Sequence, residues 1–255
     1  MKDAFVNKVI YITGATAGIG FALAELLLAK GATVVISGRN NKTLESAQKK
    51  LHKISSNLIA HNIDVSKESE IVESLQDVYA SRGRIDGLVN NAPSIHVGKI
   101  IDLDLSAWKT NFKANLDAVF LTTKTVLPWM MDAKKGSIVN VASVVGLKGV
   151  EYLSAYGAAK AGLINFSRAS AVEGAPYVRV NCIIPGAVDT PATKRAIPDD
   201  DMMDNTVKTI PLKRIANPIE IANPIAFLLG SDASFITGAS LVVDGGKTAD
   251  LNAGN

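Results

Sequence analysis

The chain has 255 residues, of which 47% are hydrophobic and only 5% aromatic, so it is long enough for one large α/β domain with an aliphatic core. Its 27 basic and 24 acidic residues give a net charge of +3 and are interspersed, which argues against a nucleic-acid partner. No uninterrupted apolar run is long enough for a membrane span, and the N-terminal residues do not form a secretion signal.

The single cysteine, Cys182, excludes an intramolecular disulfide and suits a reducing cytosol, so we expect a cytoplasmic protein. We expect Cys182 to be a small buried apolar residue. The three histidines, His52, His61 and His96, are far apart in the sequence and show no metal-ligand spacing. The sequence therefore predicts no metal site.

Short β-branched runs alternate with segments of helical periodicity along the whole chain. The predicted strands are Lys8–Thr13, Thr33–Ser37, Leu58–Ile63, Asp86–Asn90, Ser137–Ala142, Val178–Ile184 and Ser240–Val243. This alternation predicts an α/β fold, a doubly wound seven-stranded parallel sheet with helices on both faces. No repeat or Pro/Gly-rich linker divides the chain, so residues 1–255 are expected to form a single domain.

The stretch 187–214 is predicted to be one long irregular segment. It contains Pro191, Pro198 and Pro211 and the acidic cluster 199–201. Because so long a loop in a compact domain is usually functional, we expect a substrate lid. Helix formation is predicted to resume at Asn217–Glu220, which offers an N-cap, a proline at the first helical position and a glutamate that caps back.

The glycine-rich segment Gly14–Gly20 lies between the first predicted strand and an amphipathic run. Its spacing is G-x-x-x-G-x-G. Glycines allow a tight turn and close approach of backbone N–H groups to a phosphate, and a helix N-terminus favours the negative charge. An ordinary glycine-rich turn is the alternative interpretation.

A second group of residues suggests acid/base chemistry. Ser143 follows a predicted strand, and Tyr156 and Lys160 lie four residues apart on one predicted helix face. A free phenol has a pKa of about 10, and we expect the neighbouring ammonium to lower the pKa of Tyr156. The Ser143 hydroxyl could then hold a substrate oxygen in line for proton transfer. A solvated surface pair is the alternative for Tyr156 and Lys160 taken alone.

Together, Thr13 with the three glycines, Ser143, the Tyr-x-x-x-Lys pair and Trp108-x6-Asn115 resemble the classical short-chain dehydrogenase/reductase family, which has a Rossmann-type fold. The resemblance implies that Tyr156 is the general acid/base and that Ser143 orients the substrate. It also implies that Lys160 lowers the pKa of Tyr156 and binds the nicotinamide ribose. Asn115 would help to hold a proton-relaying water.

Further matches extend from Lys8 to Gly246 and imply a cofactor cleft. Asp64-Val65 resembles the adenine-contacting pair, Asn90-Asn91-Ala92 the start of an N-N-A-G motif, and 185–190 the P-G-x-x-x-T segment near the nicotinamide. Plain readings remain open, with Asp64 as a helix cap and Pro185-Gly186 as a turn. The expected cofactor-binding residues are Gly14, Thr16, Gly18, Ile19, Gly20, Arg39, Asp64, Val65, Asn91, Ala92, Tyr156, Lys160, Pro185, Gly186, Val188 and Thr190.

The cofactor is expected to be NADP(H), with NAD(H) possible. An acidic residue at the end of the second strand would select NAD, but that position is Gly38, followed by Arg39. An arginine can pair with a 2′-phosphate. A solvated arginine in a turn is the plain alternative.

The expected function is hydride transfer between NADP(H) and a moderately apolar ketone or secondary alcohol. Alternatives are an NAD-linked sugar, polyol or hydroxysteroid dehydrogenase and a non-catalytic dinucleotide-binding sensor or structural protein. The expected substrate pocket contains Pro93, His96, Val145 and Tyr152. Pro93 departs from the family, which usually has glycine there. The resemblance also implies a homotetramer or homodimer.

Overall fold

The computed structural model describes residues 5–197 and 199–250. Its centre is a seven-stranded parallel sheet with the order β3-β2-β1-β4-β5-β6-β7. The strands are β1 (Val9–Ile12), β2 (Thr33–Gly38), β3 (Leu58–Asn62), β4 (Gly87–Asn90), β5 (Gly136–Val141), β6 (Val178–Pro185) and β7 (Ser240–Val243). The predicted fold class is confirmed, and each predicted strand is found with boundaries that differ by at most a residue or two.

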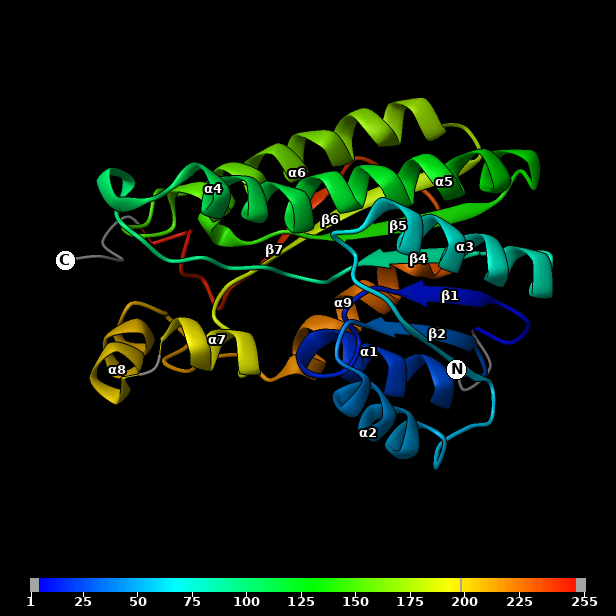
Figure 1. Ribbon diagram of the computed structural model, residues 1–255, viewed down its shortest axis with the longest axis horizontal. Coiled ribbons are helices and arrows are strands. Elements are labelled where there is room, and N and C mark those ends of the chain that lie inside the picture. Colours follow the sequence, from blue (N-terminus) through cyan, green and yellow to red (C-terminus); the bar gives the residue numbers. More distant parts are fainter. Residues whose placement is uncertain (1–4, 198, 251–255) are drawn as a thin grey trace.

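Helices cover both faces of the sheet (Figure 1). One face carries α1 (Gly18–Ala29), α2 (Asn41–Leu51) and α9 (Pro218–Leu229). The other carries α3 (Glu68–Arg82), α4 (Leu105–Phe112), α5 (Ala118–Asp132) and α6 (Ser154–Gly174). The short turns are η1 (Ile100–Asp102), η2 (Lys113–Asp117), η3 (Val144–Gly146) and η4 (Ser231–Ala233).

The alternation of side chains along the strands explains the two cores. Ile10 and Ile12 of β1 pack on the side of α1 and α9, whereas Val9 and Tyr11 pack on the side of α3 and α5. Successive strand residues point to opposite faces, and both faces are covered. A strand such as β1, which is buried on both faces, therefore needs apolar residues without interruption.

The order of strands reverses between β1 and β4, which are paired neighbours. In an open α/β sheet, ligands bind beyond the C-terminal ends of the strands at such a reversal. In Figure 1 the strands run toward the side on which α7 (Pro191–Ala196) and α8 (Asp200–Lys208) lie. This edge is where the functional residues should be sought.

The sequence suggested that the stretch 187–214 is irregular. This expectation is wrong, because the stretch contains the helices α7 and α8. Each has a local start signal: Thr190 accepts a hydrogen bond from the Thr193 N–H ahead of Pro191, and Asp199 accepts one from Asp201 N–H. The prolines had suggested a loop, although Pro191 at the first helical position is compatible with a helix. Pro198 lies outside the described residues.

The predicted start of α9 is confirmed. Asn217 and Glu220 form a reciprocal capping box with Pro218 at the first position, and the Asn217 N–H donates to Glu220 Oε2 over 2.8 Å. Within residues 5–197 and 199–250, no helix combines the length and apolarity that crossing a membrane would need.

Candidate active site

The residues singled out in the sequence gather along the C-terminal edge of the sheet. Gly14 follows β1, Arg39 follows β2, Asp64 follows β3, Asn91 follows β4 and Ser143 follows β5. Because all strands are parallel, these positions share one edge. Segments far apart in the sequence thus meet along one edge of the sheet.

The glycine loop after β1 is packed against the end of β4. Gly14 has φ +65°, and a Cβ built on it would lie 2.6 Å from Ala92 Cα. Gly18 has φ +57°, and a Cβ there would lie 2.9 Å from Thr190 Cγ2. Side chains are excluded at both positions by conformation and by space. The contact at Gly18 also brings the loop together with the segment after β6, two of the predicted cofactor segments.

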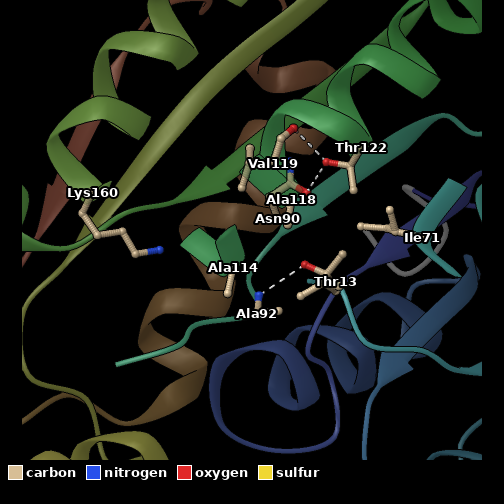
Figure 2. A pocket seen from close by; sticks show the side chains of 10 residues that line it. Thr13, Ile71, Asn90, Ala92, Ala114, Ala118, Val119, Thr122 and Lys160 are labelled. Carbon is tan, nitrogen blue, oxygen red and sulfur yellow. Dashed lines mark hydrogen bonds between the residues drawn. The ribbon is translucent and has the colours of Figure 1, made fainter. Parts of the chain in front are cut away.

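Thr13 and Asn91 fix this loop with hydrogen bonds. Thr13 Oγ1 accepts from the backbone N–H groups of Asn91 and Ala92 at 2.9 and 3.2 Å. Asn91 Nδ2 donates to the carbonyls of Thr13 and Gly14 at 3.0 and 2.9 Å. Figure 2 shows Thr13 reaching Ala92 beside a small cavity toward which the Lys160 ammonium points. Thr13 was seen in the sequence only as part of a motif, and the structure gives it a positioning role.

The first turn of α1 fits a pyrophosphate group. Its N-cap residue is Ala17, which has no side-chain oxygen to accept from the first-turn N–H groups. The turn Gly18-Ile19-Gly20-Phe21 carries no acidic side chain that would repel an anion. These N–H groups and the helix dipole therefore suit a phosphate ligand.

Tyr156 and Lys160 share one buried face of α6, as predicted. Lys160 Nζ lies 5.7 Å from the centroid of the Tyr156 ring. The sequence suggested a lowered pKa for Tyr156, but in this structure the pKa of Tyr156 is raised overall. Burial raises the pKa of Tyr156 to about 12, while a hydrogen bond with the Ser143 side chain lowers it. Tyr156 is therefore a phenol that holds its proton at neutral pH.

Lys160 is a buried cation and not a solvated surface residue. Its side chain is buried, and Nζ donates to the Val141 carbonyl at the end of β5 over 2.8 Å. Burial lowers the pKa of Lys160 to about 8, while Cys182 beneath it raises that value. Cys182 itself is fully buried, as expected from the sequence.

The pKa of Lys160 makes stability depend on pH. A lysine with a pKa of about 8 when folded and 10.5 when unfolded binds fewer protons in the folded state between those values. The free energy of unfolding should therefore rise with pH across this window, relative to Lys160→Met, by up to about 3 kcal/mol. Urea unfolding from pH 7.5 to 10 at fixed protein concentration measures it.

Lys148→Met is the matched control because Lys148 is exposed near η3. Its stability should follow the wild-type pH profile. Parallel profiles for the wild type and Lys160→Met would contradict a depressed pKa of Lys160.

Asn115 lies in a π-helical turn, η2, between α4 and α5 that packs against α6. Its Nδ2 donates to the carbonyls of Ser94 at 2.6 Å and Asn111 at 2.8 Å, and its Oδ1 accepts from Ser94 N–H at 3.4 Å. Asn111 Oδ1 in turn accepts from His96 N–H at 3.4 Å. The two asparagines thus clamp the segment after β4. Asn111 was missed in the sequence, where only its spacing of four from Asn115 could have indicated it.

A buried polar network behind the site was also missed. Asn90 Nδ2 donates to Asn140 Oδ1, Asn140 Nδ2 donates to Ser167 Oγ, and Thr122 Oγ1 donates to Asn90 Oδ1, over 2.7 to 2.9 Å. Because buried amides are costly unless paired, this network joins β4 and β5 to α5 and α6 in one arrangement. It supports the implied role of the Asn90-Asn91-Ala92 segment in the central strand.

Arg39 and Gly38 lie at the end of β2, next to Asp64 at the end of β3. Arg39 is exposed. Burial raises the pKa of Asp64, but hydrogen bonds from Ser66 and, to a smaller extent, the charge of Arg39 lower it below its ordinary value. Asp64 Oδ1 accepts from Ser66 N–H at 2.9 Å, but Asp64 is not the helix cap that was the alternative, since the N-cap of α3 is Lys67. A Cβ on Gly38 would lie 2.5 Å from Thr16 Cγ2. Gly38 is thus packed under the glycine loop.

The expected substrate residues lie on two segments that touch. Gly98 N–H donates to the Tyr152 carbonyl over 2.9 Å, joining the segment after β4 to the one after η3. Pro93, His96 and Tyr152 are exposed, and Val145 lies against α6 at Gly157, beside Tyr156. Tyr152 has φ +67°, an uncommon conformation for a tyrosine.

The remaining cofactor residues have structural partners of their own. Val65 lines the small cavity of Figure 2, and Ile19 packs on the core beside α9. A Cβ on Gly186 would lie 2.9 Å from Asp244 Cα, and Val188 is buried. Thr190 is the N-cap of α7. In residues 5–197 and 199–250, no three His, Cys, Asp or Glu side chains are grouped to hold a metal.

The sequence is similar to a known family and to characterised oxidoreductases. The profile of a family described as enoyl-(acyl carrier protein) reductase matches residues 14–248. The chain is 38% identical over 248 residues to the 3-oxoacyl-(acyl-carrier-protein) reductase FabG of Chlamydia muridarum, covering 96% of this chain and 99% of that protein. It is 34% identical to cyclopentanol dehydrogenase of Comamonas, covering 96% and 98%.

Solved structures agree with these relatives. The crystal structure of levodione reductase superposes with a TM-score of 0.93 at 31% identity, covering 97% of this chain and all of that one. A structure from Beutenbergia cavernae, designated an NAD(P)-dependent gluconate 5-dehydrogenase with bound NADP, gives 0.93 at 29% identity, covering 98% and 100%. The chain therefore belongs to the classical short-chain dehydrogenase/reductase family and is an oxidoreductase that acts on alcohol and carbonyl groups.

Proposed function

We propose that the protein is an NADP(H)-dependent oxidoreductase of ketones and secondary alcohols in which Tyr156 is the general acid/base. The observation that carries this proposal is that Tyr156 and Lys160 lie together on a buried face of α6, with Lys160 Nζ 5.7 Å from the centroid of the Tyr156 ring. Ser143 stands at the end of β5, directly before η3, which packs on α6. The glycine loop and the first turn of α1 supply a phosphate site at the same edge.

In the reductive direction, Tyr156 donates its phenolic proton to the carbonyl oxygen, breaking its own O–H bond. The buried phenol holds its proton at neutral pH, as donation in this direction requires. The Ser143 hydroxyl holds the same oxygen in line. NADP(H), when bound, supplies or takes up the hydride. We propose that the Lys160 ammonium, 5.7 Å from the centroid of the ring, supports the negative charge left on the phenol oxygen.

The preference for NADP(H) rests on Arg39. Arg39 is exposed at the end of β2, and Gly38 before it has no carboxylate to repel a phosphate. A related site accepts NADP, since the Beutenbergia cavernae structure holds it at low occupancy. We infer that Arg39 pairs with the 2′-phosphate and that NADPH binds at least about tenfold more tightly than NADH, about 1.4 kcal/mol.

Reversal of this preference needs three substitutions. Gly38→Asp with Arg39→Leu supplies a ribose acceptor and removes the cation, but a Cβ at position 38 overlaps Thr16 Cγ2. Thr16→Ser removes that methyl group and leaves the hydroxyl. We expect the triple variant to bind NADH more tightly than NADPH, and Thr16→Ser alone to keep the native order. Fluorescence titration with both cofactors measures it, and equal affinity of the native protein for both would refute the assignment to Arg39.

Pro93 is proposed to shape the substrate pocket rather than the cofactor site. It precedes Ser94, which Asn115 clamps, and it is exposed in the cleft segment. Proline fixes φ and lacks an N–H, so it adds apolar bulk where glycine would allow close approach of a ligand. Pro93→Gly should therefore change kcat or substrate preference more than NADPH affinity.

Pro93→Ala separates the two effects because it restores the N–H without the conformational freedom of glycine. If Pro93→Gly changes substrate preference and Pro93→Ala does not, the conformational freedom of the backbone is the cause. A large loss of NADPH binding with unchanged substrate preference would show that this segment serves the cofactor instead.

The substrate class is proposed from the site and from the relatives. The expected pocket residues Pro93, Val145 and Tyr152 are mainly apolar, and His96 adds a polar group. We propose that residues 187–214, with α7 and α8, form the lid over this pocket. A homotetramer or homodimer is proposed from the family.

A panel of ketones assayed with both cofactors tests the function. It should include cyclopentanone, a cyclic diketone and a 3-oxoacyl thioester, because relatives are named for such substrates. We expect oxidation of NADPH at 340 nm with at least one member. Tight cofactor binding without turnover of any member would favour a sensor that has kept the fold.

A further inference from the structure

The opposite edge of the sheet contains a second pocket. It has a volume of about 310 Å³ and lies where β1, β5 and β6 begin. This size is at the lower end of the range for small-molecule sites. β5 begins at this pocket and ends at Val141, the acceptor of Lys160, so the length of the strand separates the two sites by roughly 15–20 Å.

Charge is concentrated in this pocket. Four cations, Lys8, Lys134, Lys135 and Arg179, line it together with a single carboxylate, Asp86. The local excess of positive charge is thus as large as the net charge of the whole chain, +3. In the rest of the sequence, basic and acidic residues are equal in number.

The one carboxylate is already engaged. Asp86 Oδ2 accepts from Arg84 Nε at 2.8 Å and from the Val9 N–H at 2.9 Å, and Oδ1 accepts from Arg84 Nη2. Lys135 lies 3.6 Å from the same carboxylate. Asp86 is thus shared between Arg84 and Lys135, and one carboxylate faces five cations when Arg84 is counted with the four in the lining.

The cations also crowd one another. Burial lowers the pKa of Lys8, and the nearby charges of Lys135, Arg179 and Arg84 lower it further, against the opposite effect of Asp86. Arg179 is half-buried and donates to the carbonyls of Gly230 at 3.0 Å and Ile236 at 3.2 Å, not to a carboxylate. These contacts fix a cation in the wall of the pocket.

The rest of the lining suits a compact organic anion. Ser231 and Ser234 add hydroxyl groups, while Pro176, Tyr177 and Leu229 add apolar surface. Lys134 Nζ lies 5.8 Å from the centroid of the Tyr177 ring, so a cation and an aromatic face lie together. We propose that this pocket binds a small phosphate-bearing molecule, whose phosphate group meets Lys8, Lys135 and Arg179 and whose apolar part packs on Tyr177.

The test uses phosphate and phenyl phosphate as probes and Lys8→Gln/Lys135→Gln as the variant. Lys49→Gln/Lys50→Gln on α2 is the matched control, since it removes the same charge from exposed positions outside the pocket. Thermal unfolding and calorimetric titration are run at constant ionic strength set with NaCl, so that general screening is equal. Phosphate bound at the glycine loop stabilises all three proteins alike, and the difference between them isolates the pocket.

We expect saturable binding of both probes to the wild type and the control, with phenyl phosphate the tighter. The dissociation constant should rise at least tenfold in Lys8→Gln/Lys135→Gln, and Tyr177→Ala should remove the advantage of phenyl phosphate. Lys134→Gln, at an exposed side chain, gives a second and milder variant with the same direction of change. Equal binding by wild type, variant and control would overturn the proposal, as would a stabilisation that NaCl reproduces. The proposal of this phosphate site is independent of the proposed function, since its test needs neither the cofactor nor turnover.

Discussion

Tyr156→Phe should reduce turnover by about 10²–10⁴-fold, the usual contribution of a positioned general acid or base. The substitution removes the phenolic proton and leaves the ring, which is buried on α6 with the Lys160 ammonium 5.7 Å from its centroid. NADPH affinity should change little, so the loss should appear in kcat and not in the dissociation constant of the cofactor. Stopped-flow reduction of the best ketone and fluorescence titration of NADPH measure the two quantities.

Tyr79→Phe is the matched control, because it removes a phenolic hydroxyl from α3, where the ring stacks on Trp129. It should retain full activity. Lys160→Met should impair both turnover and cofactor affinity, in contrast to Tyr156→Phe. If Tyr156→Phe kept activity near that of the wild type, another group would have to carry the proton.

The sequence predicted those features of the fold that depend on local pattern. Apolar β-branched runs gave the seven strands, and residues placed directly after them proved to share one edge of the sheet. Asn217 to Glu220 predicted the start of α9 because a capping box is a local signal. The start of α7 has a local signal of the same kind, an N-cap threonine followed by Pro191 at the first helical position. The nearby prolines and the acidic cluster nevertheless suggested a loop there.

Features set by distant residues could not be predicted in this way. The raised pKa of Tyr156 follows from burial by several elements, and the spacing to Lys160 suggested the opposite direction. Thr16 beside Gly38 and Asn111 beside His96 are likewise contacts between segments that are separate in the sequence. The order of charges along the chain also gave no sign that the cations at positions 8, 134, 135 and 179 meet in one pocket.

Gly14→Ala should abolish useful NADPH binding, weakening it at least about 100-fold, because two separate constraints act at this position. The backbone has φ +65°, which costs an L-residue roughly 1–2 kcal/mol. In addition, the new methyl group would lie 2.6 Å from Ala92 Cα and 2.8 Å from Ala92 Cβ. The loop must then move away from the end of β4 and carry its N–H groups out of position.

Gly83→Ala separates the two constraints, since Gly83 at the end of α3 has φ +69° but a Cβ there would meet nothing within 4 Å. It should lower the melting temperature by a few degrees, the effect of about 1 kcal/mol, and leave NADPH affinity unchanged. Gly14→Ala/Ala92→Gly removes the contact with Cβ but not the closer one with Cα, so it should stay defective. If Gly14→Ala bound NADPH as well as Gly83→Ala does, or if the double variant recovered fully, backbone overlap with the end of β4 would not be what holds the loop in its phosphate-binding shape.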